Sequence, residues 1–450
     1  MIKNQWDIMH YFLTGGPVGA FFGTKKDMYM LYHINELKNA ALWPAHLASE
    51  ATSSLLDLID HDMENPYVRF LAATNALVER TTRVFDKPKF NIEYVNRGKY
   101  RLKVSEVDIF SKAFCNLKYF NREVPRGKKE KELDQDPIVL IVAPLSGHFA
   151  TLLRDTAMAM IPYHQTYITD WEDSKRIPLS EGDFDLDQYV EYLLDFIRAL
   201  YTRHGGRRIH VMAVCQPSMP VLMAASLLAS YNEPCQLASM TLMGGPIDTR
   251  INPGKVNVFA SSHSIEWFRE NILMKVPSYY PGVGRLVCPG FVLLSGFMSL
   301  NIERHQEASQ KFFKHLVQGD LDGAHAHSRF YDEYRSVMDV PGKYFVESIE
   351  HSFQKHSLAM GTMTWRGYPI DPSAIRHTGL MTVEGELDDI SCVGQTLAAH
   401  GLCNNLSASR HHQYYQQGVG HYGIFNGSRW RGSIQPQIAK FIMEQEVLSR

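Results

Sequence analysis

Residues 208–220 read Arg-Ile-His-Val-Met-Ala-Val-Cys-Gln-Pro-Ser-Met-Pro, and this stretch decides the fold. Its first half is a run of mostly apolar residues, which is typical of a buried strand. The run leads directly into Cys215, whose side chain is a nucleophile. Pro217 then opens a helix, because proline at a first helical turn lacks only an N–H that has no partner within the helix. The pattern predicts a strand, a tight turn that carries Cys215, and a helix.

This arrangement has the outline of a nucleophile elbow, usually written G-x-S-x-G, in which small flanking residues let the strand and the helix approach each other. Ala213 and Pro217 hold the two glycine positions here. Cysteine suits the turn because a helix N-terminus and a neighbouring imidazolium both favour the reactive thiolate. An isolated cysteine at a strand end is more often a small buried apolar residue, so the catalytic interpretation needs support from other residues.

Strands and helices alternate on both sides of this stretch. The apolar run at 137–144 predicts another strand that is buried on both faces of a parallel sheet. The alternation requires crossover connections, so we predict a mostly parallel, doubly wound α/β sheet with helices on both faces. Further strands are expected at 165–168, 209–214, 240–243, 379–385 and 413–416, and helices at 186–201, 217–231, 391–399 and 435–444.

The remaining segments predict how the chain is divided. Helical spacing of apolar residues before the sheet predicts a helical N-terminal extension over residues 1–100. The core then occupies 101–250 and begins with antiparallel strands. The alternation fails over 251–375, which we interpret as an inserted cap rich in aromatic residues, and the core resumes over 376–450.

Two later segments supply an acid and a base. Asp388 follows the predicted strand 379–385 and completes the pattern G-x-x-D, and we favour it over its neighbour Asp389, which suits a helix N-cap, and over Asp248. His421 lies in a glycine-rich loop after the last predicted strand. The chain order of nucleophile, acid and base is that of the α/β-hydrolases.

A third segment predicts an oxyanion hole. The loop 144–148, Pro-Leu-Ser-Gly-His, follows the first buried strand, where this fold supplies one backbone N–H to the oxyanion. Leu145, with Ser146 beside it, is the expected donor there. The second donor is the amide of Gln216, which follows the nucleophile. An ordinary strand-to-helix turn is the alternative interpretation of the loop.

Four segments resemble the intracellular polyhydroxybutyrate depolymerases: A-V-C-Q-P-S-M-P at 213–220, A-P-L-S-G-H at 143–148, E-G-E-L-D-D-I at 384–390 and G-V-G-H-Y-G-I-F-N-G at 418–427. The resemblance extends over nearly the whole chain, including D-I-M-H-Y-F at 7–12. It implies an α/β-hydrolase with a Cys-Asp-His triad that cleaves a storage polyester. In that triad Cys215 is the nucleophile, His421 the general base and then acid, and Asp388 the group that orients His421.

Two other functions are compatible with the same residues. A polyhydroxyalkanoate synthase resembles this chain in fold and triad, but its elbow usually reads G-x-C-x-G, whereas Ala213 and Pro217 flank Cys215 here. A non-catalytic granule-surface protein would instead bind polymer through aromatic residues of the cap. The candidates for such contacts are Trp267, Tyr279, Tyr280, Phe291, Phe297, Phe312 and Phe313.

The composition of the chain restricts the kinds of partner and cofactor that the protein is expected to bind. A net charge of -2 over 450 residues gives no reason to expect nucleic acid, and a basic run at 126–129 is interpreted as a solvated loop. The six cysteines form no C-x-x-C pair, which favours reduced thiols. No phosphate loop, metal cluster or nucleotide motif is present, so we expect no cofactor.

The sequence also predicts the cellular location of the protein. Residues 1–7 lack the features of a secretion signal, and the longest apolar stretch, 287–300, is interrupted by Pro289, Gly290 and Gly296, so no membrane span is expected. We therefore expect a cytoplasmic enzyme at storage granules, with polymer or oligomer as partner and water or coenzyme A as acyl acceptor. The oligomeric state is left open.

Overall fold

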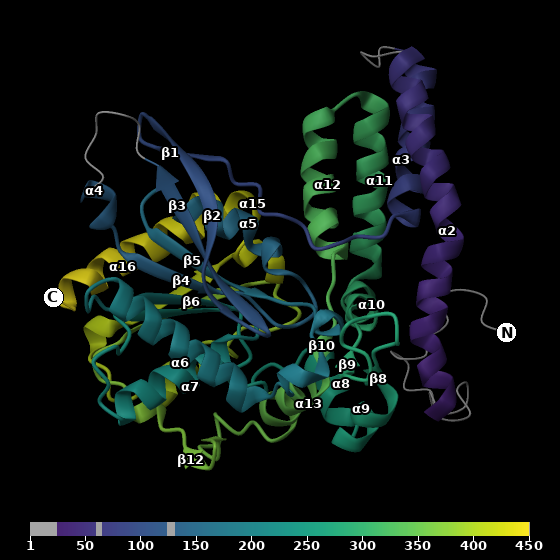
Figure 1. Cartoon of the computed structure of the whole chain (residues 1–450). Coiled ribbons are helices and arrows are strands. Elements are labelled where there is room, and N and C mark those ends of the chain that lie inside the picture. The colour runs from purple at the N-terminus through teal and green to yellow at the C-terminus, as the bar shows by residue number, and fades with distance from the viewer. Residues whose placement is uncertain (1–24, 60–64, 124–130, 450) are drawn as a thin grey trace.

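A computed structural model describes residues 25–59, 65–123 and 131–449 (Figure 1). The expectations placed on residues 1–7, 7–12 and 126–129 lie outside these ranges. Nine strands form one sheet in the order β1-β2-β3-β5-β4-β6-β7-β13-β14. Their bounds are β1 Tyr94–Arg97, β2 Tyr100–Lys112, β3 Cys115–Glu123, β4 Ile138–Val142, β5 Gln165–Trp171, β6 His210–Val214, β7 Ser239–Met243, β13 Gly379–Gly385 and β14 His411–Gln416.

The sheet is antiparallel at one side and parallel elsewhere. β1, β2 and β3 pair antiparallel, and β3 pairs antiparallel with β5. From β5 to β14 all neighbours are parallel. The exchange of β5 and β4 in the order is that of the α/β-hydrolase fold. The predicted doubly wound, mostly parallel sheet is therefore confirmed.

Helices cover both faces of this sheet, as Figure 1 shows. One pair, α6 (Leu186–Arg203) and α7 (Ser218–Ser230), packs together on one face, whereas α5 (Arg154–Met160) and α16 (Gln435–Leu448) lie on the other. Every residue of β4, β5, β6, β7 and β13 is buried as a result. This two-sided burial explains why β4 is an uninterrupted apolar run, Ile-Val-Leu-Ile-Val.

Two local predictions differ from the structure. The sheet begins at Tyr94, inside the segment 1–100 that was expected to be a helical extension. Residues 391–398 form turns, and only a short helix, α14 (Ala399–Leu402), follows. The buried carboxylate of Glu384 accepts hydrogen bonds from the N–H groups of Gly394, Thr396 and Leu397 at 2.9–3.0 Å. These donors bind a side chain, so they do not build a helix there.

Helices outside the sheet form a second layer beside it (Figure 1). The N-terminal helices α2 (Lys25–Ile59) and α3 (Pro66–Thr82) pack against each other, and α3 packs on α11 of the insertion. Within the described ranges, no helix has the length and apolar character needed to span a membrane. The insertion contains α8 Lys255–Ser262, α9 Ile265–Asn271, β8 Met274–Lys275, β9 Leu286–Cys288, α10 Gly290–Leu300, α11 Ile302–Gln318, α12 Leu321–Arg335, β10 Val340–Pro341 and α13 Gly342–Ile349.

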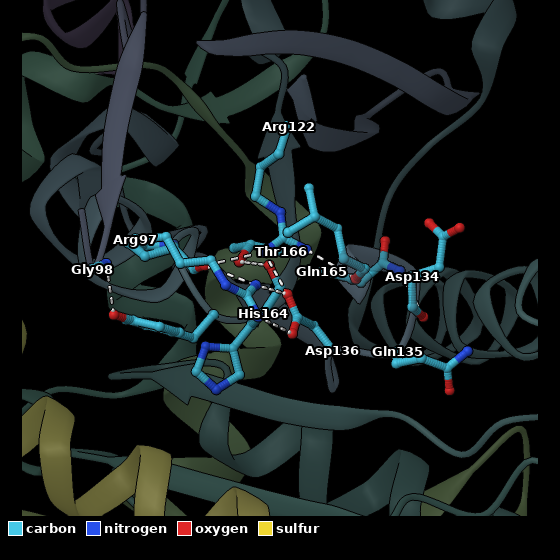
Figure 2. Close-up of polar contacts among 12 residues, drawn as sticks. Arg97, Gly98, Arg122, Asp134, Gln135, Asp136, His164, Gln165 and Thr166 are labelled. Atoms are coloured by element: carbon cyan, nitrogen blue, oxygen red, sulfur yellow. Dashed lines mark hydrogen bonds and ion pairs between the residues drawn. The ribbon is translucent and has the colours of Figure 1, made fainter. Parts of the chain in front are cut away.

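An ion cluster fastens the antiparallel strands to the parallel ones (Figure 2). Asp136, which precedes β4, accepts hydrogen bonds from Arg97 at 3.1 Å and from Arg122 at 2.6 Å. Both guanidinium groups also donate to the Pro162 carbonyl at 3.2 Å. The cluster sits where the parallel strands begin, whereas ligands of open α/β sheets bind at the carboxyl ends of the strands. We therefore assign it to stability.

Candidate active site

Cys215 lies in a strained turn between β6 and α7. Its φ of 68° is in the left-handed region, which a non-glycine residue adopts only when the surrounding structure holds it there. The Cys215 N–H donates to the Met243 carbonyl at 2.7 Å, and the Cys215 carbonyl accepts from the Ser218 N–H at 3.1 Å. These bonds fix the turn on both sides. The geometry is that of a nucleophile elbow, with the cysteine half-buried at its tip.

Asp388 and His421 form a buried pair. The Asp388 Oδ2 atom lies 2.8 Å from His421 Nδ1, and the carboxylate side chain has no exposed surface. The other carboxylate oxygen accepts hydrogen bonds from the N–H groups of Ile390 and Ser391, each at 2.9 Å. Because both oxygens are held, the carboxylate has a fixed orientation toward the imidazole ring.

The two alternative carboxylates lie elsewhere. Asp389 accepts a hydrogen bond from the Asn301 side chain. Asp248 pairs with the Arg250 guanidinium at 2.7 Å and 2.8 Å. Of the three candidate carboxylates, Asp388 is therefore the one that is hydrogen-bonded to His421.

His421 contacts Cys215 through its other side. Burial lowers the pKa of His421, but the negative charges of Asp388 and Cys215 and the hydrogen bonds to both groups outweigh burial, so the pKa lies well above its usual range. The raised pKa keeps a proton on the ring at neutral pH. The trio therefore places a proton donor next to the cysteine sulfur.

The predicted oxyanion loop lies at the same edge of the sheet. β4 pairs in parallel with β6 in a register that places Val142 opposite Ala213, so the residues after β4 run alongside the elbow. Leu145 is buried and Ser146 is half-buried, like Gln216 on the elbow itself. The two segments that carry the expected backbone donors are therefore neighbours.

Contacts from the insertion hold this loop in place. The Gly147 carbonyl accepts from the Met338 N–H at 2.7 Å, and His148 Nε2 lies 3.1 Å from the Tyr334 carbonyl. Burial lowers the pKa of His148 to about 4, only partly opposed by that hydrogen bond, so the ring is neutral at pH 7. His148 is thus a packing residue rather than a second charged imidazole.

Aromatic side chains of the insertion pack against the residue next to the histidine. The ring of Tyr422 lies 5.7 Å from that of His421, 5.3 Å from that of Tyr334 and 5.8 Å from that of Phe330. Tyr334 and Phe330 both belong to α12. Tyr422 therefore links the insertion to the histidine, and none of these three aromatic residues is among the candidates for polymer contacts named above. Among those candidates, Tyr279 is the one that is exposed.

Gly244 is a site residue that the sequence interpretation missed. Its φ is +55°, and a Cβ there would lie 3.2 Å from both Asp388 Oδ2 and His421 Cε1. Its neighbour Gly245 is equally constrained, since a Cβ would lie 2.0 Å from Ser218 Oγ behind the elbow. A Gly-Gly pair directly after a buried strand beside the elbow is the signal that could have identified both.

We expect Gly244→Ala to impair both stability and activity. The added Cβ meets the Asp388–His421 pair, and the left-handed backbone disfavours any side chain, so the free energy of unfolding should fall by about 1–3 kcal/mol. Denaturant unfolding and ester hydrolysis measure the two effects. Gly401→Ala is the matched control, because nothing lies within 4 Å of a Cβ at that position. Equal behaviour of the two variants would contradict the role given to Gly244.

The strand order and the elbow define the class: the protein is an α/β-hydrolase. Residues 244–446 match the family model described as PHB de-polymerase C-terminus, where PHB is polyhydroxybutyrate. This part of the chain is similar to that family, in agreement with the resemblance seen in the sequence. An α/β-hydrolase core that carries such a domain supports ester hydrolase activity.

Several solved structures are similar to the chain, at low identity. A 2-hydroxy-6-oxo-6-phenylhexa-2,4-dienoate hydrolase from Rhodococcus sp. strain RHA1 has 12% identity and a TM-score of 0.40, with 76% of this chain and 99% of that chain covered. A thermophilic esterase from Thermogutta terrifontis has 10% identity and a TM-score of 0.38, with 81% and 99% covered.

A monoacylglycerol lipase from Paleococcus ferrophilus has 11% identity and a TM-score of 0.38, with 69% of this chain and 96% of that chain covered. Because all three scores are low, the fold class rests on the strand order of this chain. No curated protein matches the chain in sequence.

Proposed function

We propose that the protein is an intracellular depolymerase that cleaves the ester bonds of poly(3-hydroxybutyrate) or a related polyhydroxyalkanoate through an acyl-cysteine intermediate. The observation that carries the proposal is the Asp388–His421 pair, whose imidazole contacts a cysteine in a left-handed elbow. The family of residues 244–446 supports the polymer as substrate.

In the first half of the reaction, the Cys215 thiolate attacks an ester carbonyl carbon and forms a tetrahedral oxyanion. Backbone N–H groups of Leu145, or of Ser146 beside it, and of Gln216 bind that oxyanion. The intermediate collapses, the C–O bond of the ester breaks, and protonated His421 gives its proton to the departing alcohol. The acyl group remains on the sulfur as a thioester.

In the second half, His421 removes a proton from water, and the hydroxide attacks the thioester carbonyl. The carboxylic acid leaves and Cys215 returns to the thiolate. Asp388 stays ionised throughout and stabilises the imidazolium, since both of its oxygens accept hydrogen bonds. Coenzyme A is the alternative acyl acceptor, and its thiol would take the place of water at this step.

The surroundings of the site suit an apolar ester. Tyr422 links His421 to Tyr334 and Phe330 of α12, and aromatic rings offer no charge that would select an ionic substrate. We assign residues 251–375 to a cap over the core, the residues before β1 to an N-terminal extension, and the protein to the cytoplasm at storage granules.

The proposal predicts the direction of the reaction. Incubation with amorphous poly(3-hydroxybutyrate) should release hydroxybutyrate or its oligomers, detected by mass spectrometry, and incubation with 3-hydroxybutyryl-CoA should yield no polymer. Omission of the polymer is the control for the first assay. Polymer formed from the thioester would show a synthase instead, and polymer binding without any product would show a granule-surface protein.

A further inference from the structure

The outer face of helix α2 carries a regular row of exposed apolar residues. Positions three and four residues apart repeat along the helix, and each of them is exposed, with Leu37 at 68% and Leu58 at 84%. Ordinary surface helices place polar residues on such a face. We call this row the seam; its members are Ile34, Leu37, Ala41, Pro44, Ala48, Ala51, Leu55 and Leu58.

The opposite face of α2 is the one that binds the rest of the molecule. Ser49 exchanges hydrogen bonds of 2.8–3.1 Å with Asn75 of α3, and Leu56 is buried beside it. Nearer the start of the helix, the Tyr32 hydroxyl donates to Asp339 at 2.6 Å. One side of the helix thus contacts the rest of the described chain, whereas the apolar seam on the other side is exposed. An exposed apolar stripe of this kind marks an interaction site.

The seam has the spacing of a coiled coil. Ile34, Ala41, Ala48 and Leu55 are seven residues apart, and Leu37, Pro44, Ala51 and Leu58 form the second heptad series. In heptad notation these are the a and d positions, which face a partner helix. A strict seven-residue repeat keeps such a row in line when two helices wind around each other. The seam therefore fits a helix better than it fits a flat surface.

The order of residue sizes along the seam fits a second copy in the opposite direction. With the two-fold axis near His46, each a residue faces a d residue of the other copy, as antiparallel pairing requires. Large residues then meet large ones, and small residues meet small ones. The pairs are Ile34 with Leu58, Leu37 with Leu55, Ala41 with Ala51, and Pro44 with Ala48.

Charges beside the seam do not oppose this pairing. The flanking e and g positions between 33 and 59 contain no Asp or Glu, and Lys38 is their one Lys or Arg. In the antiparallel register Lys38 faces Thr52 of the other copy, so no like charges meet. The acidic residues Glu36, Glu50 and Asp57 all occupy the c position, away from the seam.

The seam is long enough for a helix pair. From Ile34 to Leu58 it is about 36 Å long at the rise of an α-helix, and it holds four a and four d positions. Apolar a and d positions sustained over about three to four heptads indicate coiled-coil pairing.

We propose that α2 is a dimerisation helix, and that two copies of this chain pair antiparallel through the seam. The contact is isologous, so it closes at two chains and does not propagate. It is independent of the proposed catalytic residues, none of which belongs to α2.

Light scattering after size exclusion tests the dimer. The wild-type protein at micromolar concentration should have twice the mass of the chain, and Leu37→Glu and Leu58→Glu should each halve that mass. Hydrolysis of a small soluble ester should not change, which separates loss of pairing from loss of folding. Val447→Glu is the control, since it replaces an apolar residue of 72% exposure on a different helix. A monomeric wild type would overturn the proposal, as would a monomer that uses the seam to bind phosphatidylcholine vesicles or polymer particles.

Cross-linking tests the direction of the two helices. A mixture of Ala41→Cys and Ala51→Cys chains should give a bis-maleimide cross-linked dimer, and each variant alone should give no more than the wild type. The wild type is the background because Cys215 and Cys392 are half-exposed. Parallel pairing would place each new thiol opposite itself, so efficient cross-linking of Ala41→Cys alone would overturn the antiparallel arrangement.

Discussion

Cys215→Ala is expected to reduce ester hydrolysis at least about 10⁴-fold, because loss of the nucleophile from a triad leaves only oxyanion binding and substrate positioning. The measurement is the initial rate on a soluble hydroxybutyrate ester. Alanine suits the comparison because the elbow already holds a non-glycine residue at positive φ. Circular dichroism should show an unchanged fold.

Cys392→Ala is the matched control for this variant. Cys392 is the other half-exposed cysteine, and its thiol is not in contact with His421. Its replacement should leave the rate within about twofold. Mass spectrometry of wild-type protein quenched with a slow ester should find the acyl group on Cys215. An acyl group on another residue, or retained activity in Cys215→Ala, would rule out the proposed mechanism.

Asp388→Asn is expected to reduce kcat about 10²- to 10⁴-fold while the ring position is kept, because an amide can no longer stabilise the imidazolium. The negative charge of Asp388 raises the pKa of His421, so its removal lowers that pKa. The proposed mechanism needs a protonated His421, which gives its proton to the departing alcohol. The alkaline limb of the pH–rate profile should therefore move to lower pH.

Asp389→Asn distinguishes the two neighbouring carboxylates. Asp389 contacts Asn301 rather than the histidine, so its variant should keep the wild-type pH profile. A pH profile that shifts in Asp389→Asn and not in Asp388→Asn would reverse the assignment of the acid.

The core could be predicted from the sequence because its strands are buried on both faces. β4 is a short apolar run and β6 is apolar after His210; the loop 144–148 follows the first and Cys215 follows the second. The pairing of Asp388 with His421 could be anticipated from chain order, since parallel strands end at one edge of the sheet. The strands could thus be predicted from local sequence pattern, and the acid–base pair from the general topology of parallel sheets.

What could not be predicted depends on contacts between distant residues. The bonds from residues 394–397 to Glu384 replace a predicted helix by turns, and no local pattern reveals that carboxylate as the acceptor. The role of Gly244 appears only once β7 lies beside β13 and brings Asp388 and His421 against it. The spacing of apolar residues predicts that α2 is a helix, but the sequence does not tell which face of the helix is covered. The seam therefore could not be recognised from the sequence.

The placement of the insertion between β7 and β13 has a consequence for synthesis on the ribosome. β7 ends at Met243, and its parallel neighbour begins at Gly379, so more than a hundred residues are made while that edge of β7 has no partner. At bacterial or eukaryotic elongation rates this interval lasts roughly 10 s. An unpaired strand edge is a template for aggregation. During that interval the nascent chain exposes the edge of β7, a strand whose five residues are all buried in the folded protein. Synthesis of the insertion is therefore the stage at which the chain is open to aggregation through β7, and pairing with β13 ends that stage.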